Sequence, residues 1–107
     1  MTTTDLKLPK SISRLYSRLD EKVLLQALQI ALRRTIAQER KELKTVQTRI
    51  RKFERKYKKR FREFEKNLPP EGDYVIHEDY GEWSFLHEKA GILAQDIADY
   101  EKVYGRL

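Results

Sequence analysis

No glycine or proline occurs between Pro9 and Pro69, so neither of the strong helix-breaking residues interrupts this stretch. Apolar side chains recur through it at the three- and four-residue spacing of a helix face. The upstream members are Val23, Leu24, Ala27, Leu28, Ala31, Leu32, Thr35 and Ile36. The downstream members are Leu43, Val46, Ile50, Phe53, Tyr57, Phe61, Phe64 and Leu68. The pattern predicts a mainly helical chain, and one unbroken helix over residues 21–67 would be about 70 Å long.

The apolar pattern thins at residues 38–42, which we interpret as a bend or a solvated junction between two modules. Residues 67–73, Asn-Leu-Pro-Pro-Glu-Gly-Asp, form the clearest break in the chain. We therefore expect a basic helix over residues 41–67, a loop over residues 68–80 and an acidic helix over residues 81–105. The apolar face of this last helix consists of Trp83, Leu86, Ala90, Leu93, Ile97, Tyr100, Tyr104 and Leu107.

Charge is distributed unevenly along the 107 residues, whose formal net charge is +6. Residues 33–68 hold fifteen basic and five acidic side chains, whereas residues 69–107 hold three basic and nine acidic ones. Such asymmetry indicates either pairing between the two halves or two different partners. Two arrangements stay open. The basic and acidic helices pack antiparallel and bury both apolar faces, or one or both faces bind a partner protein.

The chain lacks the sequence motifs of several function classes. It has no cysteine, which excludes disulfides and thiolate metal sites, and it has no glycine-rich phosphate loop. His77 and His87 match no standard spacing of metal ligands. We therefore expect no enzyme, no metal and no cofactor. No apolar run approaches the roughly 18 residues of a membrane span, and no signal pattern opens the chain, so we expect a cytoplasmic protein without a membrane contact.

Polar and apolar residues alternate at residues 4–8, which predicts a short β-strand that ends at Pro9. Leu6 and Leu8 share one face of this strand, and Thr3, Asp5 and Lys7 share the other. Ser11 then suits the N-cap of a short helix. A lone strand of this length lacks a pairing partner, so it requires a second chain.

The N-terminal order, carried by Asp-Leu-Lys-Leu-Pro-Lys-Ser at residues 5–11 and by the helix over residues 23–36, resembles a ribbon-helix-helix module. The resemblance implies a homodimer formed through the N-terminal strand. It also implies that the outward strand residues enter the major groove of operator DNA. The DNA-binding residues expected from it are Thr3, Asp5, Lys7, Lys10 and Ser11.

The stretch from Arg-Ile-Arg-Lys-Phe-Glu-Arg-Lys-Tyr at residues 49–57 to Glu82 and Trp83 resembles the second half of small prokaryotic antitoxins. The resemblance implies a cognate toxin protein of the nuclease type as partner. We expect aromatic anchors to fill grooves of the toxin. The expected partner-binding residues are Phe53, Tyr57, Phe61, Phe64, Tyr80, Trp83, Phe85, Leu86 and Tyr100.

Together these features predict a mainly α fold with one short N-terminal β-strand. Residues 1–40 would form a ribbon-helix-helix-like dimerisation and DNA-binding module, and residues 41–107 a helical toxin-binding module. The expected function is an antitoxin that neutralises its toxin and autoregulates its operon by binding operator DNA. The alternatives are a stand-alone DNA-binding transcriptional regulator with an extended basic helix, and a helical coiled-coil adaptor.

Overall fold

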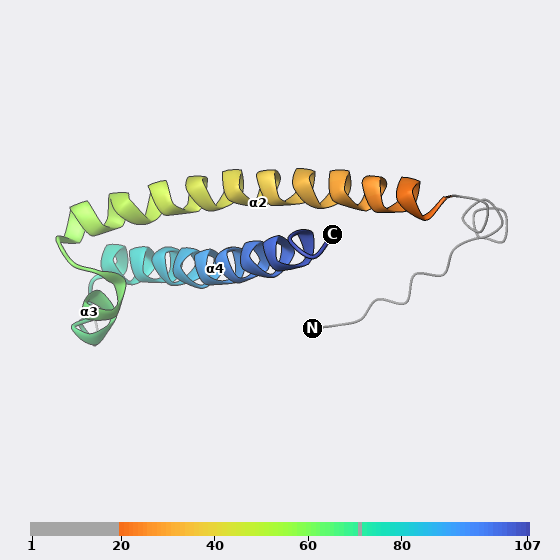
Figure 1. Ribbon diagram of the computed structural model, residues 1–107. Coiled ribbons are helices and arrows are strands. Elements are labelled where there is room, and N and C mark those ends of the chain that lie inside the picture. The colour runs from red at the N-terminus through yellow and green to blue at the C-terminus, as the bar shows by residue number, and fades with distance from the viewer. Residues whose placement is uncertain (1–19, 71) are drawn as a thin grey trace, which may run out of the picture.

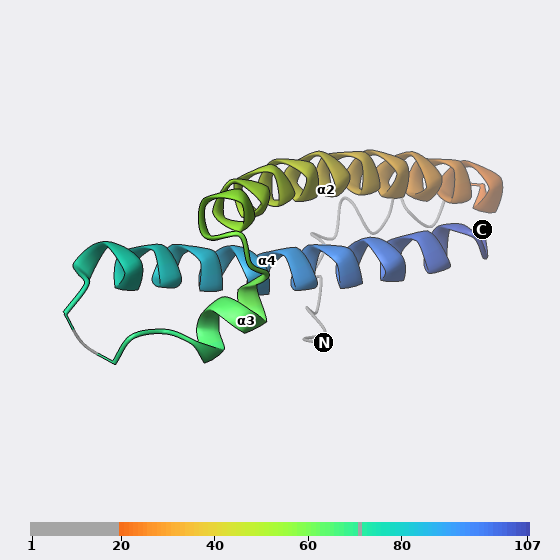
Figure 2. The same ribbon diagram turned by 90° about the vertical axis from the view of Figure 1, so that its left-hand side faces the viewer.

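The fold is a long helical hairpin with a short third helix at its closed end. A computed structural model describes residues 20–70 and 72–107, and all regular structure in these residues is helical: α2 (Glu21–Tyr57), α3 (Phe61–Lys66) and α4 (Tyr74–Tyr104). Helices α2 and α4 lie side by side and antiparallel, and α3 lies against α4 (Figures 1 and 2). The described part extends about 65 × 25 × 17 Å.

Local chemistry sets where α2 begins and ends. The Asp20 side chain caps its start by accepting a hydrogen bond from the Lys22 backbone N–H at 3.2 Å. No residue breaks the helix until Lys58, whose φ of 54° and ψ of 38° place it in the left-handed region. This conformation costs a non-glycine residue about 1 kcal/mol. It turns the chain so that α3 buries Phe61 and Phe64, a gain that exceeds the cost.

Helix α4 begins earlier than its apolar face alone indicates. The Asp73 side chain accepts from the backbone N–H groups of Val75 at 3.1 Å and Ile76 at 3.3 Å, which caps the helix at Tyr74. The helix then continues for 31 residues and passes through Gly81 and Gly91 without a break.

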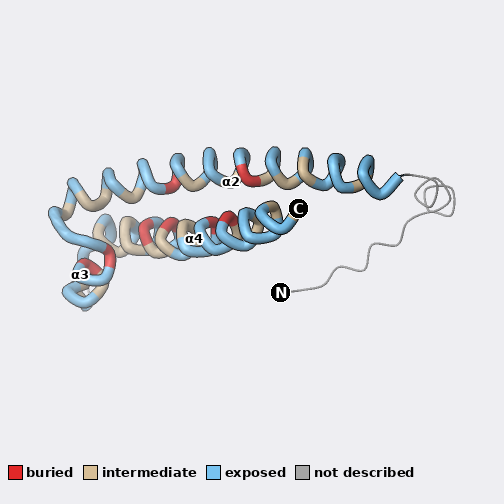
Figure 3. The backbone as a smooth tube through the Cα atoms, in the orientation of Figure 1, coloured by how far each residue is buried: buried red, intermediate tan, exposed pale blue. Residues whose placement is uncertain are grey.

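Two regular apolar stripes hold α2 and α4 together. One buried cluster joins Val46 of α2 to Leu86 and Leu93 of α4, and Ile50 and Phe53 pack against it. A second cluster at the closed end contains Phe61, Phe64 and Trp83. Positions alternate at three- and four-residue steps along both stripes, which is the spacing of an antiparallel coiled coil. Figure 3 shows these buried positions facing one another between the helices, while the first turns of α2 are mainly exposed.

The predicted fold class is wrong for the part of the chain that the structure describes. Residues 20–70 and 72–107 contain no strand. The helix that begins at Glu21 also does not end near residue 40, where the predicted dimeric module ends. Residues 21–40 are the first half of one 37-residue helix, because neither a breaker nor a cap occurs near residue 40. The strand predicted at residues 4–8, and the dimer that it would form, fall on residues 1–19 and lie outside the described residues.

Three element bounds also differ from the prediction. No break occurs at residues 38–42, the basic helix divides into α2 and α3 around Lys58, and residues 74–80 are helical instead of forming a loop. The left-handed conformation of Lys58 accounts for the division of the basic helix. The Asp73 cap accounts for the helical conformation of residues 74–80. Of the two arrangements that the sequence left open, the structure shows the antiparallel hairpin that buries both apolar faces. None of the described helices has a stretch long and apolar enough to cross a membrane.

Candidate partner-binding surfaces

The closed end of the hairpin is built around Trp83, which has no exposed surface. The indole ring stacks on Phe53 at 5.5 Å between ring centres, meets the edge of Phe61 at 5.6 Å and lies 5.0 Å from Phe64. Its N–H has no hydrogen-bond partner among the described residues, so packing alone holds it. Aromatic pairs of this geometry contribute about 0.5–1.5 kcal/mol each beyond the area they bury.

Most residues expected to bind a partner belong to this interior. Phe61, Phe64, Trp83 and Leu86 are buried, and Phe53, Tyr57, Tyr80 and Tyr100 are half-buried. Phe85 differs, because 63% of it is exposed on the outer side of α4. The structure therefore brings eight of the nine residues into the hairpin itself and leaves Phe85 accessible. Thr3, Asp5, Lys7, Lys10 and Ser11, expected to bind DNA, lie outside the described residues.

Two polar clusters fix the aromatic interior in place. In the first, Asp79 of α4 accepts hydrogen bonds from Lys56 Nζ at 2.6 Å and from the hydroxyl of Tyr57, both on α2. Burial acts to raise the pKa of Asp79. The hydrogen bonds from Lys56 and Tyr57 outweigh this effect and hold the pKa below its usual range. Burial and the bond to Asp79 raise the pKa of Tyr57.

The second cluster ties α3 to α4. The hydroxyl of Tyr80 donates to Glu65 Oε2 at 2.8 Å, and Arg62 Nη1 donates to Glu65 Oε1 at 3.1 Å. These two donors lower the pKa of the Glu65 carboxyl, with Tyr80 as the larger cause. Each cluster thus keeps a carboxylate charged at the closed end, where it connects two helices.

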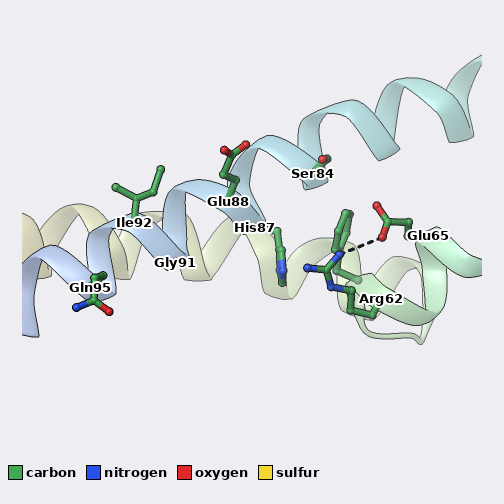
Figure 4. Close-up of a pocket in the computed structure, with 9 residues that line it drawn as sticks. Arg62, Glu65, Ser84, His87, Glu88, Gly91, Ile92 and Gln95 are labelled. Carbon is green, nitrogen blue, oxygen red and sulfur yellow. Dashed lines mark hydrogen bonds and ion pairs between the residues drawn. The ribbon is translucent and has the colours of Figure 1, made fainter. Parts of the chain in front are cut away.

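A shallow groove of about 530 Å³ runs along α4 beside α3 (Figure 4). Its floor includes the His87 ring, which stacks on Phe61 at 4.6 Å between ring centres. Within the described residues His87 makes no hydrogen bond to Ser84, one turn away, so the pair does not form a nucleophile and its base. The other lining residues are Arg62, Glu65, Glu88, Gly91, Ile92 and Gln95. This groove is open and mixed in polarity.

A second apolar exposed surface lies at the other end of the hairpin. Helix α4 ends at Tyr104, level with Arg33, whose Nη2 donates to the Tyr104 hydroxyl at 2.9 Å. Residues 21–32 of α2 therefore project beyond α4 over about 18 Å (Figure 1). We call this stretch the projecting segment. Glu21, Leu24, Leu25 and Leu28 line an open groove of about 480 Å³ on it.

The projecting segment continues the stripe that packs against α4. Counted back from Ile36 at helical spacing, Leu32, Leu28 and Leu25 fall on the same side of α2. Val23 and Ile30 lie on the opposite side and are 47% and 49% exposed. Residues 23–32 include no charged side chain. The sequence pattern placed these residues in the helix of a ribbon-helix-helix-like module, and the signal for a binding surface was this uncharged stretch.

No family model, curated protein or solved structure matches this chain. Among residues 20–70 and 72–107, no group of three His, Asp or Glu side chains is placed to hold a metal ion. The functional inference therefore rests on the surfaces described above.

Replacing Trp83 tests whether the aromatic residues form the core or serve as anchors for a partner. We expect Trp83→Ala to lower the free energy of unfolding by about 3–5 kcal/mol, because it leaves a large cavity. Phe85→Ala should change it by less than about 1 kcal/mol, since the ring is mostly exposed. Urea unfolding followed by circular dichroism measures both, and the milder Trp83→Phe gives a value if Trp83→Ala does not fold. Equal changes in the free energy of unfolding at the two positions would contradict the assignment of Trp83 to the core.

The Asp79 cluster predicts a pH-dependent stability. Because the pKa of Asp79 lies below its ordinary value of 3.8 in the folded chain, the carboxylate stabilises the fold above that pH. This contribution is lost as the pH falls through the folded pKa. Asp79→Asn should therefore lower Tm by roughly 5 °C at pH 7 and have a smaller effect at pH 2, because protonation of the carboxyl removes part of its contribution. Glu88→Gln, on an exposed carboxylate of the same helix, is the control. A Tm difference of the same size at both pH values would refute the linkage.

Proposed function

We propose that this chain binds a partner protein by inserting the projecting segment into an apolar groove of that partner. The observation that carries the proposal is that residues 23–32 are uncharged and that most of them, all but Leu24, Gln29 and Leu32, are exposed beyond the end of α4. A helix that is apolar on all sides is normally buried. Within the described residues, nothing covers Leu25, Leu28 or Ile30, which are 37–49% exposed.

The distribution of these side chains favours a groove over a flat surface. Leu25 and Leu28 face the line of α4, whereas Val23 and Ile30 face away from it. A flat surface would cover one of these sides and leave the other in water. A groove covers both, as in complexes where an amphipathic helix lies in a hydrophobic cleft.

The size of the segment favours a larger partner over a second copy of the chain. Two projecting segments paired with each other would bury a few hundred Å², below the roughly 1,000 Å² of a stable specific interface. Burying the exposed half of a leucine or isoleucine contributes about 1 kcal/mol, and association costs at least about 4 kcal/mol. A partner that encloses the segment buries apolar side chains on both sides of the helix, and the free energy of this burial offsets the cost of association.

Neutralisation of a toxin is the form of this function that the resemblance to antitoxins implies. A helix that occupies a groove of a toxin blocks that groove sterically, and this mode requires no catalytic group. The support for it is the exposed apolar helix described here together with the resemblance of residues 49–83. The expected partner is the protein encoded next to this chain.

The test uses Leu25→Glu together with Leu28→Glu, which place two charges on the inserted surface without shortening the helix. The matched control is Ile92→Glu together with Val103→Glu, at exposed apolar positions of α4. We expect the wild type and the control to co-purify with the product of the adjoining gene. The Leu25/Leu28 variant should bind it at least about 100-fold more weakly, since two buried anchors are lost.

Three outcomes would overturn the proposal. The first is unchanged affinity of the Leu25/Leu28 variant, and the second is equal loss in the control. The third is a concentration-dependent dimer of the wild type, measured by light scattering, that the Leu25/Leu28 variant abolishes. The third result would assign the segment to self-association and would favour the coiled-coil adaptor.

A further inference from the structure

Most of the basic side chains near the end of α2 are not neutralised by the hairpin. Nine basic residues lie between Arg49 and Arg62. Three of them pair with carboxylates: Arg49 with Glu82, Lys56 with Asp79 and Arg62 with Glu65. The other six are exposed and have no ion pair within the described residues: Arg51, Lys52, Arg55, Lys58, Lys59 and Arg60.

Several of these cations share the outer face of α2, turned away from α4. At 100° per residue they fall within one third of the helix circumference, together with basic residues further upstream. We call this surface the basic ridge, which consists of Arg34, Lys41, Lys44, Arg51, Lys52 and Arg55. All six are exposed and none has an ion pair within the described part of the chain. From Arg34 to Arg55 the ridge is about 32 Å long.

The acidic residues of α2 do not offset this charge. Glu42 pairs with Lys89 of α4 at 2.8 Å, and Glu39 and Glu54 are half-buried on the side that faces α4. On α4, Glu101 and Glu82 accept from Arg40 and Arg49 along the edges of the interface. These five carboxylates therefore lie at or beside the α2–α4 interface, and the ridge is left with one sign of charge.

We infer that the basic ridge binds the sugar-phosphate backbone of a nucleic-acid duplex without reading its sequence. The length of the ridge matches about one helical turn of a duplex, roughly 34 Å. Six cations in one row on an exposed surface suit a row of phosphates, and the counterions that they release drive association. This inference goes beyond the proposed function and rests on a different stretch of α2, which begins after the projecting segment.

The chemistry of the ridge disfavours other occupants. It has no aromatic side chain on which an unpaired base could stack, so it lacks the main feature of single-strand binding sites. The hydroxyls of Thr45 and Thr48 donate to the carbonyl oxygens of Lys41 and Lys44 in their own helix, at 3.2 and 2.9 Å, and are not directed outward. A protein partner would need an apolar centre for its interface, and the ridge has no large apolar side chain.

The experiment compares two triple variants with the same change of net charge. Lys44→Glu, Arg51→Glu and Arg55→Glu reverse the ridge. Lys22→Glu, Lys102→Glu and Arg106→Glu reverse exposed cations elsewhere. Fluorescence anisotropy with a 20-base-pair DNA duplex, between 50 and 200 mM NaCl, gives Kd and its salt dependence. Far-ultraviolet circular dichroism and Tm verify that both variants remain folded.

We expect the wild type to bind two unrelated duplex sequences with Kd values within about twofold. Its log–log salt slope should be near −5, or about −0.9 per phosphate contact. The ridge variant should bind at least about tenfold more weakly at 100 mM NaCl, with a slope smaller in magnitude by about 3. The control should retain most of the affinity and the slope. The Kd for a duplex RNA of the same length, compared with that for the DNA duplex, shows which of the two nucleic acids the ridge prefers.

Three results would overturn the inference. Equal loss in both variants would show that net charge alone is responsible. Competition by poly-glutamate as effective as competition by the duplex would assign the ridge to an acidic polypeptide. Absence of duplex binding by the wild type at 50 mM NaCl would show that the ridge is not a nucleic-acid binding site. None of these results depends on the Leu25/Leu28 variant, so the two proposals fail separately.

Discussion

The packing of α2 against α4 along two apolar stripes is the interaction on which the other features depend. At the closed end it buries Trp83 completely, and this burial accounts for the left-handed turn at Lys58 and for the short helix that follows. Further along, Val46 with Leu86 and Leu93 keeps the helices in register. Beyond the end of α4, no other described helix covers the stripe of α2, so the same pattern that forms the core also forms the projecting segment.

Charge is arranged around this packing in a consistent way. Three carboxylates of α4, Asp79, Glu82 and Glu101, lie along the interface and pair with Lys56, Arg49 and Arg40 of α2. Exposed pairs of this kind contribute at most about 1 kcal/mol each. The larger consequence of this arrangement is that no carboxylate lies on the outer face of α2 among the basic ridge residues. One helix thus presents an apolar surface at its start and a basic surface along its back.

The periodicity of the sequence predicted the apolar stripes of the basic and acidic helices, and it left open whether the two helices pack together or bind a partner. It did not predict the bounds, because these depend on caps and strain. The Asp73 cap starts α4 at Tyr74, and a lysine takes the left-handed position at residue 58 without a glycine to indicate it. The expected anchors Trp83 and Phe61 are core, since aromatic residues at helical spacing suit either role. The ribbon-helix-helix fold class failed for the described residues because α2 continues past residue 40.

The central claim is that one stripe of α2 is covered by α4 over residues 36–57 and uncovered over residues 21–32. Hydrogen exchange of the backbone amides of the isolated chain, followed by mass spectrometry, tests this most directly. The account predicts strong protection of residues 36–57 and 83–97, and exchange at least about tenfold faster in residues 23–32. Equal protection from residue 23 to residue 57 would show that the projecting segment is already covered and would contradict the account.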